Sequence, residues 1–121
     1  MKKIIIIEDE ELLLNLLQKK LIQEGYQVDV ARDGQAGLEK VREDKPDLIL
    51  LDIVMPKMGG FEVMEEIKKD EGLKDIPIVI ISNSGQPVEL DRAKKLGVND
   101  WLIKTDFDPQ EVIDKVKKQL G

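Results

Sequence analysis

The sequence contains no cysteine and no histidine among its 121 residues, and these two absences exclude much of protein chemistry. Without cysteine there is no disulfide framework and no thiol chemistry. Without histidine the chain lacks the commonest acid–base side chain and transition-metal ligand. Any chemistry must therefore depend on carboxylates, hydroxyls, amides and lysines.

Long apolar runs and an excess of basic residues are also missing. No apolar run approaches the roughly 20 residues that a membrane-spanning helix requires, and the N-terminus has no signal-peptide pattern. The net charge of −6 is unfavourable for general binding to a phosphate backbone. With 41% hydrophobic and 36% charged residues, we expect residues 1–121 to form one cytoplasmic domain without nucleic-acid or membrane binding.

What the sequence does contain is a regular alternation of short apolar runs and helical patterns. Apolar runs predict strands at residues 3–7, 26–30, 48–51, 76–81 and 101–103. The first predicted helix has its core stripe at Leu13, Leu16, Leu17 and Leu21. Apolar residues at helical spacing also predict helices at 34–43, 61–69 and 87–96, and after an N-cap at Asp108. Gly25 and Gly97 are placed to end two of these helices.

This alternation predicts the architecture. Continuous apolar strands separated by helices are typical of a parallel sheet covered on both faces. Right-handed crossovers bring the carboxyl ends of all parallel strands to the same edge. We therefore expect a flavodoxin-like (βα)5 three-layer α/β sandwich with strand order 2-1-3-4-5.

Polar side chains follow four of the predicted strands at the points where those strands end. Glu8 and Asp9 follow the first strand, Asp52 the third, Ser82 the fourth and Lys104 the fifth. Taken singly these are ordinary, since acids at a helix start complement the helix dipole and an aspartate after a strand often forms a turn. Together we expect them to converge on one edge of the sheet, where clustered negative charge calls for a positively charged ligand.

A hard divalent cation satisfies that requirement. Magnesium prefers oxygen ligands and is usually bound by one or two carboxylates together with water and phosphate oxygens. We expect Asp9 and Asp52 to bind it directly and Glu8 to act through water. Asp52 is then a carboxylate nucleophile for a phosphoryl group. Lys104 and Ser82 would stabilise the charge on the transferred oxygens.

Five segments carry a more specific combination: IIIIEDE at 4–10, PDLILLDIVMP at 46–56, MGGF at 58–61, PIVIIS at 77–82 and GVNDWLIK at 97–104. In this combination, which covers essentially the whole chain, the sequence resembles the response-regulator receiver domains of two-component signalling. The resemblance implies that Asp52 is the phosphoacceptor and that Glu8 and Asp9 form an acidic pocket. It also implies a magnesium ligand in the backbone carbonyl of Val54 and a phosphate-contacting lysine in Lys104.

The resemblance also assigns a switch and exposes two departures. Ser82 corresponds to the switch hydroxyl, and Trp101 stands where the family carries its rotating aromatic residue; half-buried packing on an edge strand is compatible with that role. Family members usually have a proline in a cis peptide after the lysine, whereas Thr105 follows here, so we predict a trans bond. Leu12 and Leu14 are predicted to lie outside the core stripe of the first helix, where they would be available to a kinase.

Three other classes of protein have related features. A magnesium-dependent aspartyl phosphohydrolase typically needs a second carboxylate two residues after the nucleophile, where this chain has Val54. A flavodoxin cradles phosphate after its first strand, but the four acids at 8–11 would repel phosphate. A receiver-shaped scaffold that is never phosphorylated remains an alternative.

The resemblance finally implies partners. We expect a histidine kinase or phosphotransfer protein as the phosphoryl donor, an unidentified output protein, and a monomer or a weak phosphorylation-dependent homodimer. The chain would not be an enzyme, since the only reactions it would catalyse are its own phosphorylation and dephosphorylation.

Overall fold

The computed structural model describes residues 1–83, 87–98, 100–104 and 108–120. Five parallel strands form one sheet in the order β2-β1-β3-β4-β5, which confirms the predicted topology. The strands are β1 (Lys3–Ile7), β2 (Gln27–Ala31), β3 (Leu48–Asp52), β4 (Ile78–Ser82) and β5 (Asp100–Ile103).

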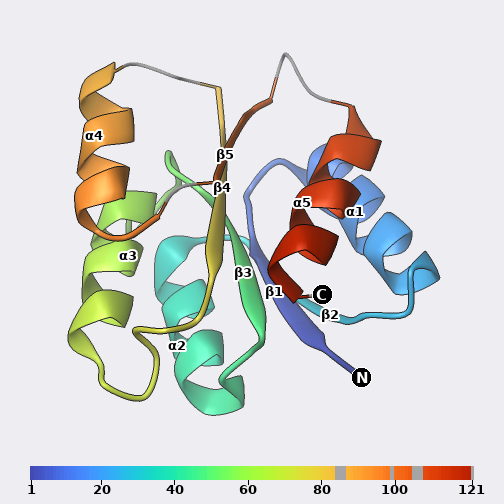
Figure 1. The fold of residues 1–121 in the computed structure, drawn as a ribbon, viewed down its shortest axis with the longest axis horizontal. Coiled ribbons are helices and arrows are strands. Elements are labelled where there is room, and N and C mark those ends of the chain that lie inside the picture. Colours follow the sequence, from blue (N-terminus) through green and yellow to red (C-terminus); the bar gives the residue numbers. More distant parts are fainter. Residues whose placement is uncertain (84–86, 99, 105–107, 121) are drawn as a thin grey trace.

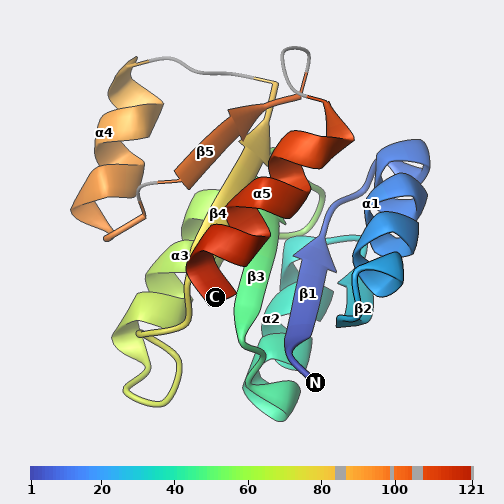
Figure 2. The same cartoon turned by 45° about the vertical axis from the view of Figure 1, so that its right-hand side comes forward.

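Helices cover both faces of the sheet, so that the domain has three layers (Figures 1 and 2). The helices are α1 (Glu11–Gln23), α2 (Gly34–Asp44), α3 (Gly60–Lys69), α4 (Pro87–Lys95) and α5 (Pro109–Leu120). Helices α1 and α5 lie on one face, whereas α2, α3 and α4 lie on the other. Among the described residues, no helix has the length and apolar character that crossing a membrane requires.

The continuous apolar strands are explained by burial on both faces. In β1, Ile4 and Ile6 point into the core beneath α1 and α5, whereas Ile5 and Ile7 point into the core beneath α2 and α3. All four side chains are completely buried. Burying each one stabilises the fold by about 1.5–3 kcal/mol, so polar residues are excluded until the strand ends.

The register of the central strands brings three polar residues to one edge. Asp52 pairs with Ile81 across β3 and β4, and Ser82 pairs with Ile103 across β4 and β5. The ladder continues beyond β5, because the Lys104 amide donates to the Ser82 carbonyl oxygen at 2.7 Å. Each strand therefore delivers its last residue to the carboxyl edge of the sheet.

The buried face of α1 differs from the predicted one. Leu14 was expected outside the core stripe but is fully buried, together with Leu17 and Leu21, whereas Leu16 was expected inside it and is 41% exposed. Leu12 is 88% exposed, in agreement with the prediction. So many leucines make two adjacent stripes equally apolar, and contact with β1 and α5 selects the one through Leu14.

The predicted helix ends are confirmed. Gly25 and Gly97 follow α1 and α4 with φ values of +97° and +83°, a backbone conformation that favours glycine. At the start of α5, the Glu111 amide donates to the Asp108 carboxylate at 3.1 Å. The predicted trans bond before Thr105 lies outside the described residues.

Candidate functional site

A cavity of about 260 Å³ opens at the carboxyl edge of the sheet, where the five predicted polar residues were expected to meet. Its lining residues are Asp9, Glu10, Asp52, Val54, Ser82, Asn83 and Lys104. Glu8 does not line this cavity; it is 2% exposed, and its carboxylate contacts the lining residue Lys104 at 2.9 Å. The structure therefore brings together the five polar residues from the ends of four strands, whereas the predicted switch residue Trp101 does not line the cavity.

The ammonium group of Lys104 occupies the centre of the site. Its Nζ atom lies 2.9 and 3.0 Å from the two carboxylate oxygens of Glu8, 3.0 Å from Glu10 Oε2 and 3.3 Å from Asp52 Oδ2. The lysine side chain is only 9% exposed. One buried cation thus holds three carboxylates that would otherwise repel one another.

Backbone amides fix the two buried carboxylates. The Glu10 amide donates to Glu8 Oε2 at 3.0 Å, because the chain turns at Glu10 to begin α1. The Ile53 amide donates to Asp52 Oδ1 at 2.8 Å. Each carboxylate therefore has one oxygen held by the main chain. The second oxygen of Asp52 accepts from Lys104 Nζ at 3.3 Å.

Two glycines allow the loop between β3 and α3 to pack tightly beside Asp52. The Gly60 amide donates to the Ile53 carbonyl at 2.8 Å, and a Cβ on Gly60 would lie 2.4 Å from the Asp52 carbonyl oxygen. A Cβ on Gly34, at the start of α2, would lie 2.0 Å from the Met58 carbonyl oxygen. The loop therefore packs against the first residues of α2 and α3 at distances that only glycine permits at positions 34 and 60.

Burial dominates the electrostatics of the site. It raises the pKa of Glu8 to about 7, although the hydrogen bond from Lys104 acts to lower this pKa. Burial likewise raises the pKa of Asp52, although the charge of Lys104 opposes the shift. Burial alone would lower the pKa of Lys104, but its contacts with Glu8 and Glu10 raise the value above the usual range. Two carboxylates with raised pKa values therefore call for more positive charge than one lysine supplies.

The arrangement fits a hard divalent cation. Glu8, Asp9 and Asp52 each offer an oxygen, and these oxygens lie within 4.8 Å of one another. Glu8 Oε1 is buried and accepts no hydrogen bond from the described residues, although Lys104 Nζ lies close to it. An unfilled buried acceptor beside two carboxylates matches the oxygen donor set that magnesium prefers.

Glu10 is the residue that the sequence reasoning missed. It was one of four consecutive acids and received no role of its own, yet its carboxylate contacts Lys104 directly. Its position after Asp9, where the first strand gives way to a helix, was a signal that could have drawn attention to it. Trp101 is half-buried on the edge strand β5, as the packing interpretation expected.

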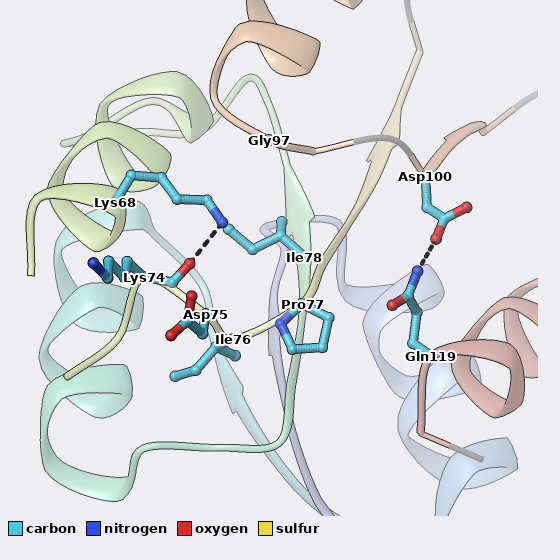
Figure 3. Close-up of a pocket in the computed structure, with 9 residues that line it drawn as sticks. All are labelled: Lys68, Lys74, Asp75, Ile76, Pro77, Ile78, Gly97, Asp100 and Gln119. Carbon is cyan, nitrogen blue, oxygen red and sulfur yellow. Dashed lines mark hydrogen bonds between the residues drawn. The ribbon is translucent and has the colours of Figure 1, made fainter. Parts of the chain in front are cut away.

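A second polar cavity, of about 290 Å³, lies at the opposite end of the sheet (Figure 3). Lys68 donates there to the Lys74 carbonyl at 2.9 Å, and Gln119 donates to the buried Asp100 carboxylate. Lys115 also contacts Asp100, at 3.3 Å. Lys68 and Asp100 thus already have hydrogen-bond or ion-pair partners within the protein, so the carboxyl edge is the stronger candidate for function.

Comparison with known proteins identifies the family. Residues 4–117 match the response regulator receiver domain. The chain is a receiver domain. Its acidic cavity is of the kind that holds the phosphoacceptor in this family, whose members are generally signalling modules and not enzymes. The predicted family and fold are thereby confirmed.

Relatives of this receiver domain include both longer regulators and single domains. It is 36% identical over 119 residues to the alkaline phosphatase synthesis transcriptional regulatory protein PhoP of Bacillus subtilis, covering 98% of this chain and 48% of the relative. The chain thus spans about half the length of the curated relatives it matches.

Solved structures include the chemotaxis protein CheY4 of Vibrio cholerae, at 27% identity and a TM-score of 0.90, with 98% of each chain covered. The Mn(2+)-bound form of response regulator Rcp1 is 30% identical, with a TM-score of 0.82, covering 98% of this chain and 91% of that one. A similar receiver therefore binds a divalent cation, and the acidic cluster of this chain is able to bind one.

Proposed function

We propose that this receiver domain is a phosphorylation-activated switch of a two-component system and that Asp52 accepts the phosphoryl group. The observation that carries the proposal is the position of Asp52, whose Oδ2 lies 3.3 Å from Lys104 Nζ and whose carboxylate belongs to the cluster with Glu8 and Asp9. The proposed nucleophile, its counter-charge and the proposed metal ligands thus lie close together.

In the proposed reaction, a carboxylate oxygen of Asp52 bonds to phosphorus while the bond between phosphorus and the donor breaks. The donor leaves with the electron pair, so no proton has to move at Asp52. Magnesium, held by Glu8, Asp9, Asp52 and the Val54 carbonyl, would neutralise charge on the carboxylates and the phosphoryl oxygens. Because the Ile53 amide holds Asp52 Oδ1, we assign Oδ2, which faces Lys104, as the nucleophilic atom.

Lys104 and Ser82 complete the proposed reaction centre. The ammonium group of Lys104 stabilises charge on the transferred oxygens, and its burial strengthens that interaction. The Ser82 side chain is buried at the end of β4, next to the strand that carries Asp52. A phosphoryl group on Asp52 would attract the Ser82 hydroxyl and draw it toward the cavity.

That movement provides the proposed switch. Trp101 pairs with Ile80 across β4 and β5, two positions before the pairing of Ser82. Its indole is half-buried at the edge of the sheet. A shift of Ser82 toward Asp52 would leave space that Trp101 can enter, which changes the surface presented by β5 and its neighbours.

The proposal includes the partners of the domain. A histidine kinase or phosphotransfer protein would supply the phosphoryl group, and an output protein or output domain would read the changed surface. We place the domain, residues 1–121, in the cytoplasm as a monomer or weak phosphorylation-dependent dimer that binds no nucleic acid itself. Transcriptional regulators among the relatives favour an output connected with transcription.

The test is incubation with acetyl phosphate and magnesium followed by intact-mass measurement. We expect a mass gain of one phosphoryl group that requires magnesium and is absent in Asp52→Asn. Asp91→Asn, an exposed change of the same kind on α4, is the matched control and should be labelled like the parent. Undiminished labelling of Asp52→Asn would refute the assignment, and an unlabelled parent would favour an unphosphorylated scaffold.

A further inference from the structure

The ion pair between Glu10 and Lys104 has a different character from the other contacts of this lysine. Glu10 Oε2 lies 3.0 Å from Lys104 Nζ, as close as the oxygens of Glu8. The Glu10 side chain is nevertheless 60% exposed, whereas the Glu8 and Asp52 side chains are 2% and 5% exposed. Lys104 is thus shared between two buried partners and one partner in contact with solvent.

The donors of Lys104 are all engaged in this arrangement. An ammonium group has three N–H donors and no acceptor. The three carboxylates that it contacts, those of Glu8, Glu10 and Asp52, provide one partner for each donor. A phosphoryl group on Asp52 requires a donor from Lys104 for its own oxygens. The donor that now faces Asp52 Oδ2 passes to one phosphoryl oxygen, but the group carries further oxygens that attract the ammonium. Lys104 is therefore drawn toward Asp52, against its contacts with Glu8 and Glu10.

Glu10 is the partner that is released at least cost. Glu8 contacts Lys104 Nζ through both carboxylate oxygens, at 2.9 and 3.0 Å, and its burial strengthens this ion pair. Asp52 carries the incoming group and cannot move away from it. The exposed carboxylate of Glu10 can exchange the ammonium for water, because solvent-exposed ion pairs contribute little to stability.

We propose that Glu10 is a positioning residue that holds Lys104 in the unphosphorylated domain and competes with the phosphoryl group for it. This inference rests on the proposed function of Asp52 as phosphoacceptor. Glu10 acts through Lys104 and does not itself contact the reacting atoms. Its contact favours the unphosphorylated state, so that Glu10 restrains phosphorylation.

The experiment compares Glu10→Gln with Glu11→Gln in phosphorylation by acetyl phosphate at saturating magnesium. Both substitutions remove one negative charge at the start of α1, but within the described part of the chain Glu11 pairs with Arg32 and not with Lys104. We expect Glu10→Gln to be phosphorylated about two- to fivefold faster than Glu11→Gln, the range that a partly exposed ion pair supplies.

Glu10→Asp separates the contact from the charge. Aspartate keeps the negative charge but is one methylene shorter, so it gives up the 3.0 Å contact with Lys104. We expect Glu10→Asp to be phosphorylated nearly as fast as Glu10→Gln. A parental rate for Glu10→Asp beside a fast Glu10→Gln would attribute the effect to charge alone and overturn the proposal. Equal rates for Glu10→Gln and Glu11→Gln would also overturn it.

An equilibrium measurement completes the test without relying on a reaction rate. Beryllofluoride with magnesium mimics the phosphoryl group on Asp52, and its affinity can be followed by ¹⁹F NMR. Glu10→Gln should bind it more tightly than Glu11→Gln by the same factor of about two to five. Unchanged relative affinity would contradict competition for Lys104. A parent that neither binds the mimic nor accepts phosphate would refute the proposed function itself, which is a distinct outcome.

Discussion

Replacing Gly34 by alanine places a methyl group at the contact between α2 and the loop after Asp52. An ideal Cβ on Gly34 lies 2.0 Å from the Met58 carbonyl oxygen, and real Cβ atoms essentially never show separations under 3.0 Å. One of the two chain segments must therefore move by about 1 Å or more. The start of α2 is held by the Asp33 side chain, which accepts from the Ala36 amide at 2.8 Å. We expect the loop to move.

The expected change in the free energy of unfolding is the difference between two opposing contributions. Inserting a methyl group into a well-packed contact costs about 1–3 kcal/mol, whereas alanine in place of glycine in a helix returns up to about 1 kcal/mol. Gly34→Ala should therefore lower the free energy of unfolding by about 1–2 kcal/mol. The displaced loop carries Val54, whose carbonyl is a proposed magnesium ligand, so magnesium binding should weaken about tenfold or more.

The assay is urea denaturation with and without magnesium, together with a magnesium titration of the folded protein. Gly72→Ala is the matched control, because a Cβ there lies no closer than 3.4 Å to its nearest neighbour. The control should retain parental magnesium affinity and stability within about 0.5 kcal/mol. If Gly34→Ala is as stable as Gly72→Ala and binds magnesium equally well, the close contact between Gly34 and Met58 does not position the site.

Three further predictions concern the charges, the switch and the lifetime of the signal. Because burial raises the pKa of Glu8 from 4.5 to about 7, the folded metal-free protein binds a proton that the unfolded chain has released, so stability should fall as the pH rises from 4.5 to 7. The free energy of unfolding, measured by denaturation across this range, should fall by about 3 kcal/mol in the parent, and Glu8→Gln should remove this pH dependence. A free energy of unfolding that rises with pH would contradict the prediction. The emission of Trp101, the only tryptophan, should shift when beryllofluoride and magnesium are added; identical spectra would argue against aromatic coupling. Val54, whose exposed side chain lines the cavity, should shield phospho-Asp52 from water, so Val54→Asn should speed phosphate loss by up to about a hundredfold, and equal half-lives would refute shielding.

The architecture, and the convergence of five polar residues on one edge of the sheet, were predictable from the sequence, whereas the contact of Glu10 with Lys104 was not. A strand buried on both faces must be apolar throughout, so the runs ending at Ile7 and Leu51 mark both the strands and the points where polar residues begin. Parallel strands then place Glu8, Asp52 and Lys104 at one edge. These inferences need only chain connectivity and the burial of apolar groups.

The face of α1 was not predictable, because its leucines satisfy two helical stripes. A shift of one residue rotates a helix by about 100°, and both stripes through α1 are apolar. Contact with β1 and α5 selected Leu14 and exposed Leu16. Local pattern sets the period of a helix, but packing sets its rotation.

Only the tertiary structure decided how the charges of the site pair. The sequence places Glu8 and Glu10 two residues apart and Lys104 far beyond them, without any indication of which carboxylates share the ammonium. The fold buries Glu8 and leaves Glu10 exposed at the same distance from Lys104. Hydrogen bonds depend on positions to within a few tenths of an ångström, whereas hydrophobic burial tolerates larger shifts. The sequence therefore determined which residues meet, and the packed structure determined how they interact.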